Sequence, residues 1–228
     1  MTRTTADPDG GWRAGLQVGA GLAVGAFALA ISFGAFAVLH GWPPWVAILA
    51  SAVTFSGSAQ FALATALAGG GGALTAVLSA ALINLRFVPM AAATARYLNG
   101  GRLQRALEGQ SVVDASWVAA QRPDGSVDRK KLFGATLVQW PAWILGTAVG
   151  ALLVPSTEFA RTYGLDVIFP GFFALLLFDS LRARPGILPL ALLAALLAGI
   201  ACLFVPPGVA LLAGALAALP ALLTRSPS

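Results

Sequence analysis

The long stretches without charge are the feature that most constrains this chain. Residues 14–85 contain no Asp, Glu, Lys or Arg, and the same holds for residues 132–157 and 185–224. A helix that spans the hydrocarbon core of a bilayer needs about 20 apolar residues, so these stretches have room for about six spans. Residues 162–181 form a further apolar segment. The sequence therefore predicts an all-α integral membrane protein with about seven hydrophobic helices.

The composition agrees with this class. Of the 228 residues, 58% are hydrophobic and 10% are charged, and the mean hydropathy is +0.82. Soluble domains average about 45–50% apolar and about 25% charged residues. The net charge of +5 would suit nucleic acid, but membrane proteins concentrate Lys and Arg in cytoplasmic loops for topological reasons. We therefore expect the lipid bilayer, and no nucleic acid, as the partner of this surface.

Turn-forming residues divide the chain into segments of a single polytopic domain, residues 1–228. The sequences "HGWPPW", "AGGGGA", "RARPG" and "VPPG" supply the Gly and Pro that end helices. The predicted segments are 15–39, 44–68, 72–97, 132–154, 163–181, 187–204 and 207–223. The pattern allows some of them to be broken or re-entrant, and it allows an inverted repeat.

One connection is long and basic. Residues 98–131 carry six Lys and Arg residues, so the positive-inside rule predicts that this loop is cytoplasmic, and alternation from it places the C-terminus there too. Three full crossings before the loop would put the N-terminus outside, whereas a cytoplasmic N-terminus would require one early segment to be re-entrant. We expect seven spans with an external N-terminus. In the loop, Ser111 and Asp114 have capping-box spacing, which predicts a short amphipathic helix at the membrane interface.

Polar residues gather at the centre of the second segment. Within seven positions it holds Thr54, Ser56, Gly57, Ser58 and Gln60. Small residues and serines are typical of tight helix packing in membranes. A glutamine amide there has four hydrogen-bonding sites and no water to satisfy them, a need that a broken helix lining a cavity would meet. Packing alone and a substrate-lining break both remain open.

A single charge, Arg86, interrupts the third segment within "AALINLRFVPM", residues 80–90. A charged residue at the centre of a span costs about 2.5–3.5 kcal/mol on insertion scales, so a second interaction must offset it. The guanidinium could snorkel toward the cytoplasmic side or join a structural ion pair; alternatively, its planar fork could take a carboxylate bidentately. The available charge partners are few: Asp114 in the loop, and Asp166 and Asp179 flanking the fifth segment, of which Asp114 and Asp166 are the candidates we retain.

The residues around Arg86 predict an irregular backbone. Pro89 removes a backbone donor close to Arg86, which frees a carbonyl in the preceding turn. Asn84 precedes Arg86 by two residues and lies on a different helical face unless the backbone unwinds.

Four sequence blocks resemble the AzlC family, the large subunit of branched-chain amino acid exporters. They are "FSGSAQFALA" (55–64), "INLRFVPMAA" (83–92), "VVDASW" (112–117) and "LDVIFPGFFALLL" (165–177), and the likeness runs from about Gly15 to the C-terminus. The resemblance implies a secondary transporter in a bacterial plasma (inner) membrane that exports branched-chain and other hydrophobic amino acids. It also implies a small membrane partner of the AzlD type.

Two positions depart from the family pattern. Asn-x-Arg is often followed by His in the family, where this chain has Phe87, and the loop acid is often Asp-Glu, where it has Asp114 and Ala115. If that histidine carries protons in relatives, this chain needs another carrier or is not proton-coupled.

The residue chemistry and the resemblance lead to one hypothesis for the site. A zwitterionic amino acid presents a carboxylate to an arginine or to helix N-terminal amides, and an ammonium to carbonyls or an acid. The predicted substrate-binding residues are Ser56, Gly57, Ser58, Gln60, Asn84 and Arg86.

Other functional classes fit the sequence less well. A serine hydrolase would need a base beside Ser56 or Ser58, but the single histidine, His40, lies roughly 24 Å away if helix continues between them. With one Cys and one His, the chain has no metal-binding motif, and we expect neither metal, cofactor nor enzyme activity. A channel or a non-transporting assembly subunit is the remaining alternative.

Overall fold

The computed structural model describes residues 10–122, 124–153, 156–164, 167, 171, 174–175, 177–178, 181–182 and 185–216. The chain forms two compact units. The first consists of Met1–Gly57 and Asn84–Ser156, and the second of Ser58–Ile83 and Thr157–Ser228. Most of the fifth predicted segment, including Asp166 and Asp179, lies outside the described residues.

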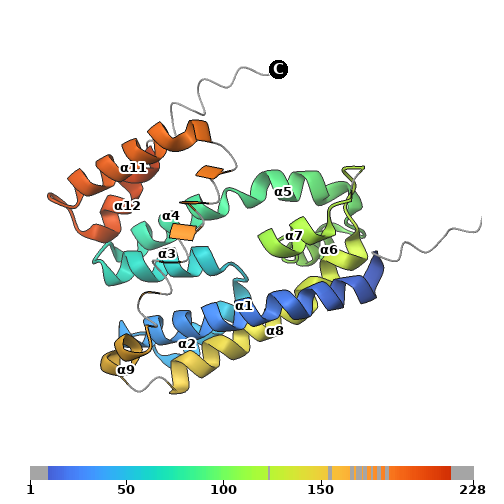
Figure 1. Cartoon of the computed structure of the whole chain (residues 1–228), viewed down its shortest axis with the longest axis horizontal. Helices are drawn as coiled ribbons and strands as arrows, with labels where there is room; N and C mark the ends of the chain where they lie inside the picture. Colours follow the sequence, from blue (N-terminus) through green and yellow to red (C-terminus); the bar gives the residue numbers. More distant parts are fainter. Residues whose placement is uncertain are drawn as a thin grey trace, which may run out of the picture. The chain divides into compact units, whose positions relative to one another are not determined.

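The described elements are all helices, which confirms the all-α part of the predicted fold class (Figure 1). The α-helices are α1 (Gly11–Leu39), α2 (Pro44–Val53), α3 (Gly57–Ala68), α4 (Gly72–Asn84), α5 (Phe87–Thr94), α6 (Arg102–Gly109), α7 (Asp114–Ala120), α8 (Arg129–Leu153), α9 (Thr157–Thr162), α11 (Leu188–Ala201) and α12 (Pro207–Leu216). The 3₁₀ helices are η1 (Ala95–Tyr97) and η2 (Pro185–Ile187).

The predicted count of seven hydrophobic helices is not reached in this part of the chain. Two described helices, α1 and α8, are long and apolar enough to cross a membrane, and the bent pair α4 and α5 makes a third if it is one span. The second and third predicted segments are each interrupted near their centres, which makes α2, α3, α4 and α5 shorter than a span.

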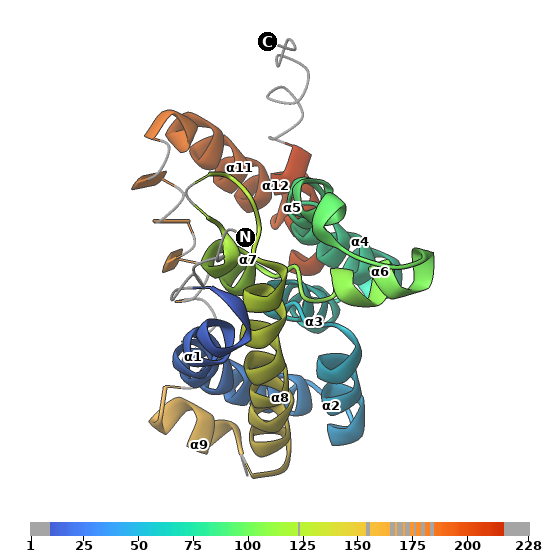
Figure 2. The same cartoon turned by 90° about the vertical axis from the view of Figure 1, so that its right-hand side faces the viewer.

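The first unit is organised by α1 and α8, which lie side by side and run parallel (Figures 1 and 2). Gly15 of α1 lies against Lys131 near the start of α8, whereas Gly34 lies against Thr147 and Ala151 near its end. Contacts that ascend together along both helices require the two N-termini to lie at the same end.

Glycines permit this close packing. A Cβ atom would collide with the backbone of the partner helix at Gly15, Gly19 and Gly34 of α1 and at Gly134, Gly146 and Gly150 of α8. Small residues at such contacts let backbones approach and increase dispersion contact, which drives helix association where lipid removes the hydrophobic effect. Gly21 and Gly25 face away from these contacts, since a Cβ atom there meets nothing within 4 Å.

The parallel pair bears on the predicted topology. Both helices are long and apolar enough to span a membrane, and they start at the same end. If both cross the membrane, Gly11 and the loop before α8 lie on the same side, and an even number of full crossings separates them. That arrangement favours the alternative with one re-entrant early segment over an external N-terminus with a cytoplasmic loop.

Both interruptions have local causes. In the second segment, α2 ends at Val53 and α3 begins at Gly57, with Thr54 extended between them. In the third, Pro89 has no amide hydrogen to donate to the Leu85 carbonyl and its ring crowds that carbonyl, so the helix stops. The Val88 amide bonds Leu85 instead, at 3.1 Å, as a tighter turn.

The basic loop is folded against the first unit. A short helix, α7, forms in the predicted region, but the capping box is wrong, because the helix begins at Asp114 and its N-cap is Val113, which makes no side-chain capping bond. A small core joins the loop to α8, consisting of Val112, Ala120, Val127 and Leu132 with Met90, Tyr97, Trp117 and Phe133 packed around it.

In the second unit, α11 and α12 pack against each other. A Cβ atom at Gly214 would come within 3.2 Å of the Ala194 carbonyl oxygen, so the two helices also approach closely at a small residue.

Candidate functional site

The two interrupted segments are joined by a hydrogen bond. The Ser56 hydroxyl, in the break between α2 and α3, donates to the Asn84 side-chain carbonyl oxygen at 2.7 Å. Asn84 is the last residue of α4, and Ser56 directly precedes α3. The bond therefore links the break between α2 and α3 to the break between α4 and α5. Ser56 is buried, and its bond occupies the acceptor of the Asn84 amide. The amide nitrogen of Asn84 is a hydrogen-bond donor, so it can serve only an acceptor.

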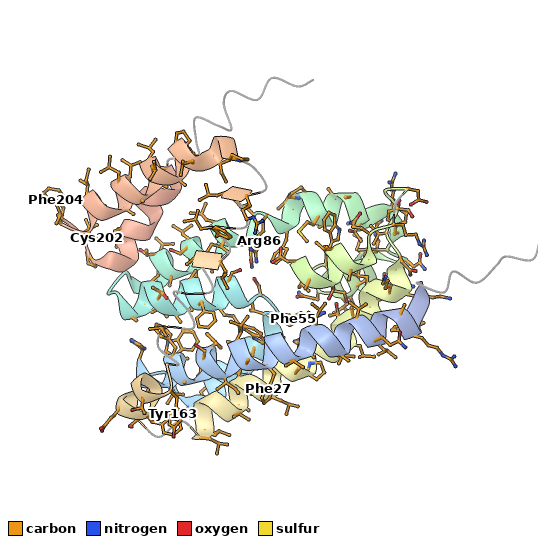
Figure 3. All side chains as sticks on the ribbon, viewed as in Figure 1. Phe27, Phe55, Arg86, Tyr163, Cys202 and Phe204 are labelled. Atoms are coloured by element: carbon orange, nitrogen blue, oxygen red, sulfur yellow. The ribbon has the colours of Figure 1, made fainter. Side chains whose placement is uncertain are left out.

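Arg86 lies in the second interruption and reaches the loop. It is the N-cap residue of α5 (Figure 3), and its guanidinium forms an ion pair with Asp114 at 2.6 Å. The same guanidinium lies over the Phe87 ring, 5.0 Å from its centroid. The turn at Leu85 and Arg86 removes the helical spacing that would have placed Asn84 and Arg86 on different faces.

The Arg86–Asp114 pair is reachable by solvent. The Arg86 side chain is 34% exposed and that of Asp114 is 52% exposed. Exposed ion pairs contribute only about 0–1 kcal/mol, so a competing ion can open this one at little cost. Partial burial raises the pKa of the Asp114 carboxyl, and the Arg86 charge acts in the opposite direction. The ion pair thus positions the two charges but is weak enough to be opened.

Aromatic side chains border the first interruption. The Phe55 ring stacks on Trp140 of α8 at 5.9 Å between centroids, and the Trp140 indole donates to the Ser51 carbonyl oxygen at 3.3 Å. A Cβ atom at Gly57 would collide with the ring of Trp143. Gly57 is therefore required where the helix resumes, and Trp140 and Trp143 hold the break against α8.

The other predicted site residues lie elsewhere. Ser58 and Gln60 are buried in the first turn of α3 and belong to the second unit. Asp166 lies outside the described residues. Within the first unit the structure thus brings together Ser56 with Asn84, and Arg86 with Asp114.

Sequence reasoning missed a buried polar contact between α7 and α8. The Ser116 hydroxyl accepts hydrogen bonds from Thr136 at 2.9 Å and from Gln139 at 2.8 Å. Ser116 follows Asp114 in the same short helix, so these bonds fix the helix that carries the partner of Arg86. The available signal was the polar Gln139 within an apolar segment.

It also missed the role of Asp128. The Asp128 carboxylate accepts from the Lys131 amide at 3.0 Å, which caps α8, and from the Gly11 amide at 2.9 Å, which starts α1. Arg122 pairs with the same carboxylate at 2.7 Å. Burial alone would raise the pKa of Asp128, but these amides and Arg122 lower it. One side chain therefore ties the starts of both spanning helices.

Glu108 anchors the loop helix α6 in a similar way. Its carboxylate pairs with Arg129, the first residue of α8, and accepts from the Gln104 side chain at 3.0 Å and the Asn99 amide at 3.1 Å. The hydrogen bond from Arg129 is the main reason why the pKa of Glu108 falls from 4.5 to about 2.

These features define a class of protein: an all-helical membrane protein with two interrupted segments joined in the membrane-spanning region and an arginine at one interruption. The comparisons are more specific. The model of the AzlC protein family matches residues 21–156, more than half of the chain, and the match contains Ser56, Asn84, Arg86 and Asp114. The chain belongs to the AzlC family.

A curated relative agrees. The inner membrane protein YgaZ of Escherichia coli (strain K12) is 26% identical over 200 residues, which cover 82% of this chain and 79% of that protein. No solved structure matches the chain.

Proposed function

We propose that this protein is the large subunit of a secondary transporter that exports branched-chain and other hydrophobic amino acids from the cytoplasm, together with a small membrane partner of the AzlD type. Family membership and the inner-membrane relative support a membrane transporter in general. The Arg86–Asp114 pair beside two interrupted helices is the observation that supports an amino acid as the cargo.

A free amino acid matches the charges of this pair. Its carboxylate can bind the guanidinium fork of Arg86, and its ammonium can bind the carboxylate of Asp114. The weak internal ion pair is then replaced by two ion pairs with the substrate. Before substrate binds, Asp114 supplies the opposite charge that Arg86 faces.

The neighbouring groups suit the remaining parts of the substrate. The side-chain amide nitrogen of Asn84 supplies a second donor for the substrate carboxylate, because the side-chain carbonyl oxygen of Asn84 accepts the hydrogen bond from Ser56. Phe55 and Phe87 lie beside the two interruptions and offer apolar contact to an aliphatic side chain. Ser58 and Gln60 stay predicted binding residues.

Counterflow in liposomes tests this function. The chain is reconstituted with its small partner, the liposomes are loaded with unlabelled leucine, and labelled leucine is added outside. A carrier accumulates the label transiently above the external concentration, whereas a channel only equilibrates it. The proposal predicts an overshoot for leucine and valine and none for glutamate; simple equilibration would favour a channel instead.

The role of Asp114 is tested in the same assay. Asp114→Asn removes the charge that meets the ammonium and keeps the side-chain shape, so we expect the overshoot to fall at least tenfold. Asp124→Asn, in an exposed turn of the same loop, is the matched control and should leave counterflow unchanged.

A further inference from the structure

A charged cavity lies at the end of the first unit where α1 and α8 begin. Its volume is about 550 Å³, and its charged lining residues are Arg122, Asp128, Arg129 and Lys130. Tyr97 adds an aromatic wall. Arg86 and Asp114 do not line this cavity, so it is distinct from the proposed transport site.

The charge of the lining is positive. Three cations and one carboxylate give a net charge of +2 (3 − 1). The carboxylate, Asp128, is already occupied by the Lys131 and Gly11 amides and by Arg122. The Asp128 carboxylate therefore interacts with groups of the chain itself and offers little attraction to an additional cation. Because Arg129 is likewise paired with Glu108, Lys130 is the lining cation that no ion pair in the described part of the chain offsets, and its charge would attract an anion.

Two of the cations are held in place and one is open to solvent. Arg122 is paired with Asp128, and Arg129 is paired with Glu108 while lying 4.7 Å from the centroid of the Phe133 ring. Lys130 is exposed and forms no ion pair within the described part of the chain. A bound anion thus meets fixed guanidinium groups and one flexible ammonium.

The cavity lies where the two longest apolar helices begin. It surrounds the first residues of the two helices that are long enough to span the membrane. Trp12 of α1 lies next to Phe133 of α8, with 6.4 Å between ring centroids, and is 46% exposed. Exposed tryptophan is typical of the interface between lipid and water.

We propose that this cavity binds the phosphate group of an anionic phospholipid in the adjacent leaflet. Anionic lipids are concentrated in the cytoplasmic leaflet, where they attract basic segments beside spanning helices. Cavities of about 300–1,000 Å³ hold small-molecule ligands, so a glycerophosphate head group fits this one. By bridging α1 and the loop before α8, the phosphate reinforces the junction that Asp128 makes.

Native mass spectrometry of the purified full-length chain tests the proposal. Binding of phosphatidylglycerol is compared with that of phosphatidylcholine of the same acyl chains, and inorganic phosphate is added as a competitor. We expect phosphatidylglycerol to bind more tightly than phosphatidylcholine. Lys130→Gln should weaken the phosphatidylglycerol affinity about fivefold, the effect of one cation near a lipid surface.

Arg102→Gln is the matched control, because it removes the same charge from an exposed position of α6 outside the cavity. It should leave the affinity unchanged, and melting temperatures without lipid show whether both variants are folded. Equal losses in the two variants would show diffuse attraction to the basic loop and overturn the site. Competition by inorganic phosphate at the same concentration as lipid would assign the cavity to free phosphate and overturn the lipid proposal.

Discussion

Ser56 and Asn84 of the first unit join the two interrupted segments through a part-buried hydrogen bond of 2.7 Å. Ser56 lies in the break between α2 and α3, and Asn84 is the last residue of α4. Non-helical backbone is tolerated at membrane depth only where protein or a water-filled cavity satisfies it. The bond therefore fixes the position of the non-helical backbone that carries Arg86.

Loss of this bond should be measurable as stability. Ser56→Ala leaves the Asn84 carbonyl oxygen without its donor, and we expect the free energy of unfolding to fall by about 1 kcal/mol. Ser79→Ala is the control, because the Ser79 hydroxyl is buried and has no hydrogen-bond partner in the described part of the chain. That variant should be as stable as the wild type or slightly more stable. Thermal unfolding in detergent compares the two; equal losses would mean that the Ser56 bond contributes nothing.

The contact between α1 and α8 should tolerate no added atoms at its glycines. Gly34→Ala places a methyl group against the backbone of Thr147, and we expect a destabilisation of about 1–3 kcal/mol, as for other overpacked contacts. Gly25→Ala in the same helix meets open space and should be neutral. Yields of folded protein and melting temperatures measure both. A stable Gly34→Ala variant would contradict the parallel packing.

The loop should lose stability in acid through Glu108. Its pKa is lower in the folded protein, about 2, than the ordinary value of 4.5, so its contribution is complete above about pH 4.5 and is lost as the pH falls toward 2. Glu108→Gln should therefore show a smaller drop in melting temperature between pH 5 and pH 3 than the wild type. Arg129→Gln should flatten the profile similarly, because Arg129 is the main cause of the shift. Parallel profiles for all three proteins would disprove the assignment.

The topology can be checked by chemical labelling. In a Cys202→Ser background, Thr4→Cys and Gln110→Cys place single thiols at the N-terminus and in the loop. Because α1 and α8 start at the same end, a membrane-impermeant maleimide should label both thiols from the same side. With the basic residues of both regions, that side is expected to be the cytoplasm. Labelling from opposite sides would contradict the fold of the first unit.

The sequence predicted the long helices better than their arrangement. Segments 15–39 and 132–154 correspond to α1 and α8 within a few residues. In a long, uninterrupted apolar run, a helix is the structure that satisfies every backbone hydrogen-bonding group within the segment. The interruptions were indicated by Pro89 and by the polar group around Gly57. The parallel pairing was not predicted, because glycines such as Gly34 and Gly150 mark a contact only once both helices are placed.

The candidate site was predicted in the same uneven way. Arg86 stood out because a single charge in an apolar run demands a partner, and Asp114 was one of three acids considered. The bond from Ser56 to Asn84 depends on both interruptions at once and has no local signal. Asp128 was missed for a similar reason, because its role requires Gly11, more than a hundred residues earlier.

The central claim is that the Arg86 guanidinium binds the carboxylate of the transported amino acid. Leucine counterflow with Arg86→Ala, compared with Arg96→Ala in the exposed end of the same segment, tests it most directly. The account predicts that Arg86→Ala is folded and inserted but shows no overshoot above empty liposomes, while Arg96→Ala matches the wild type. Wild-type counterflow by Arg86→Ala would contradict the account.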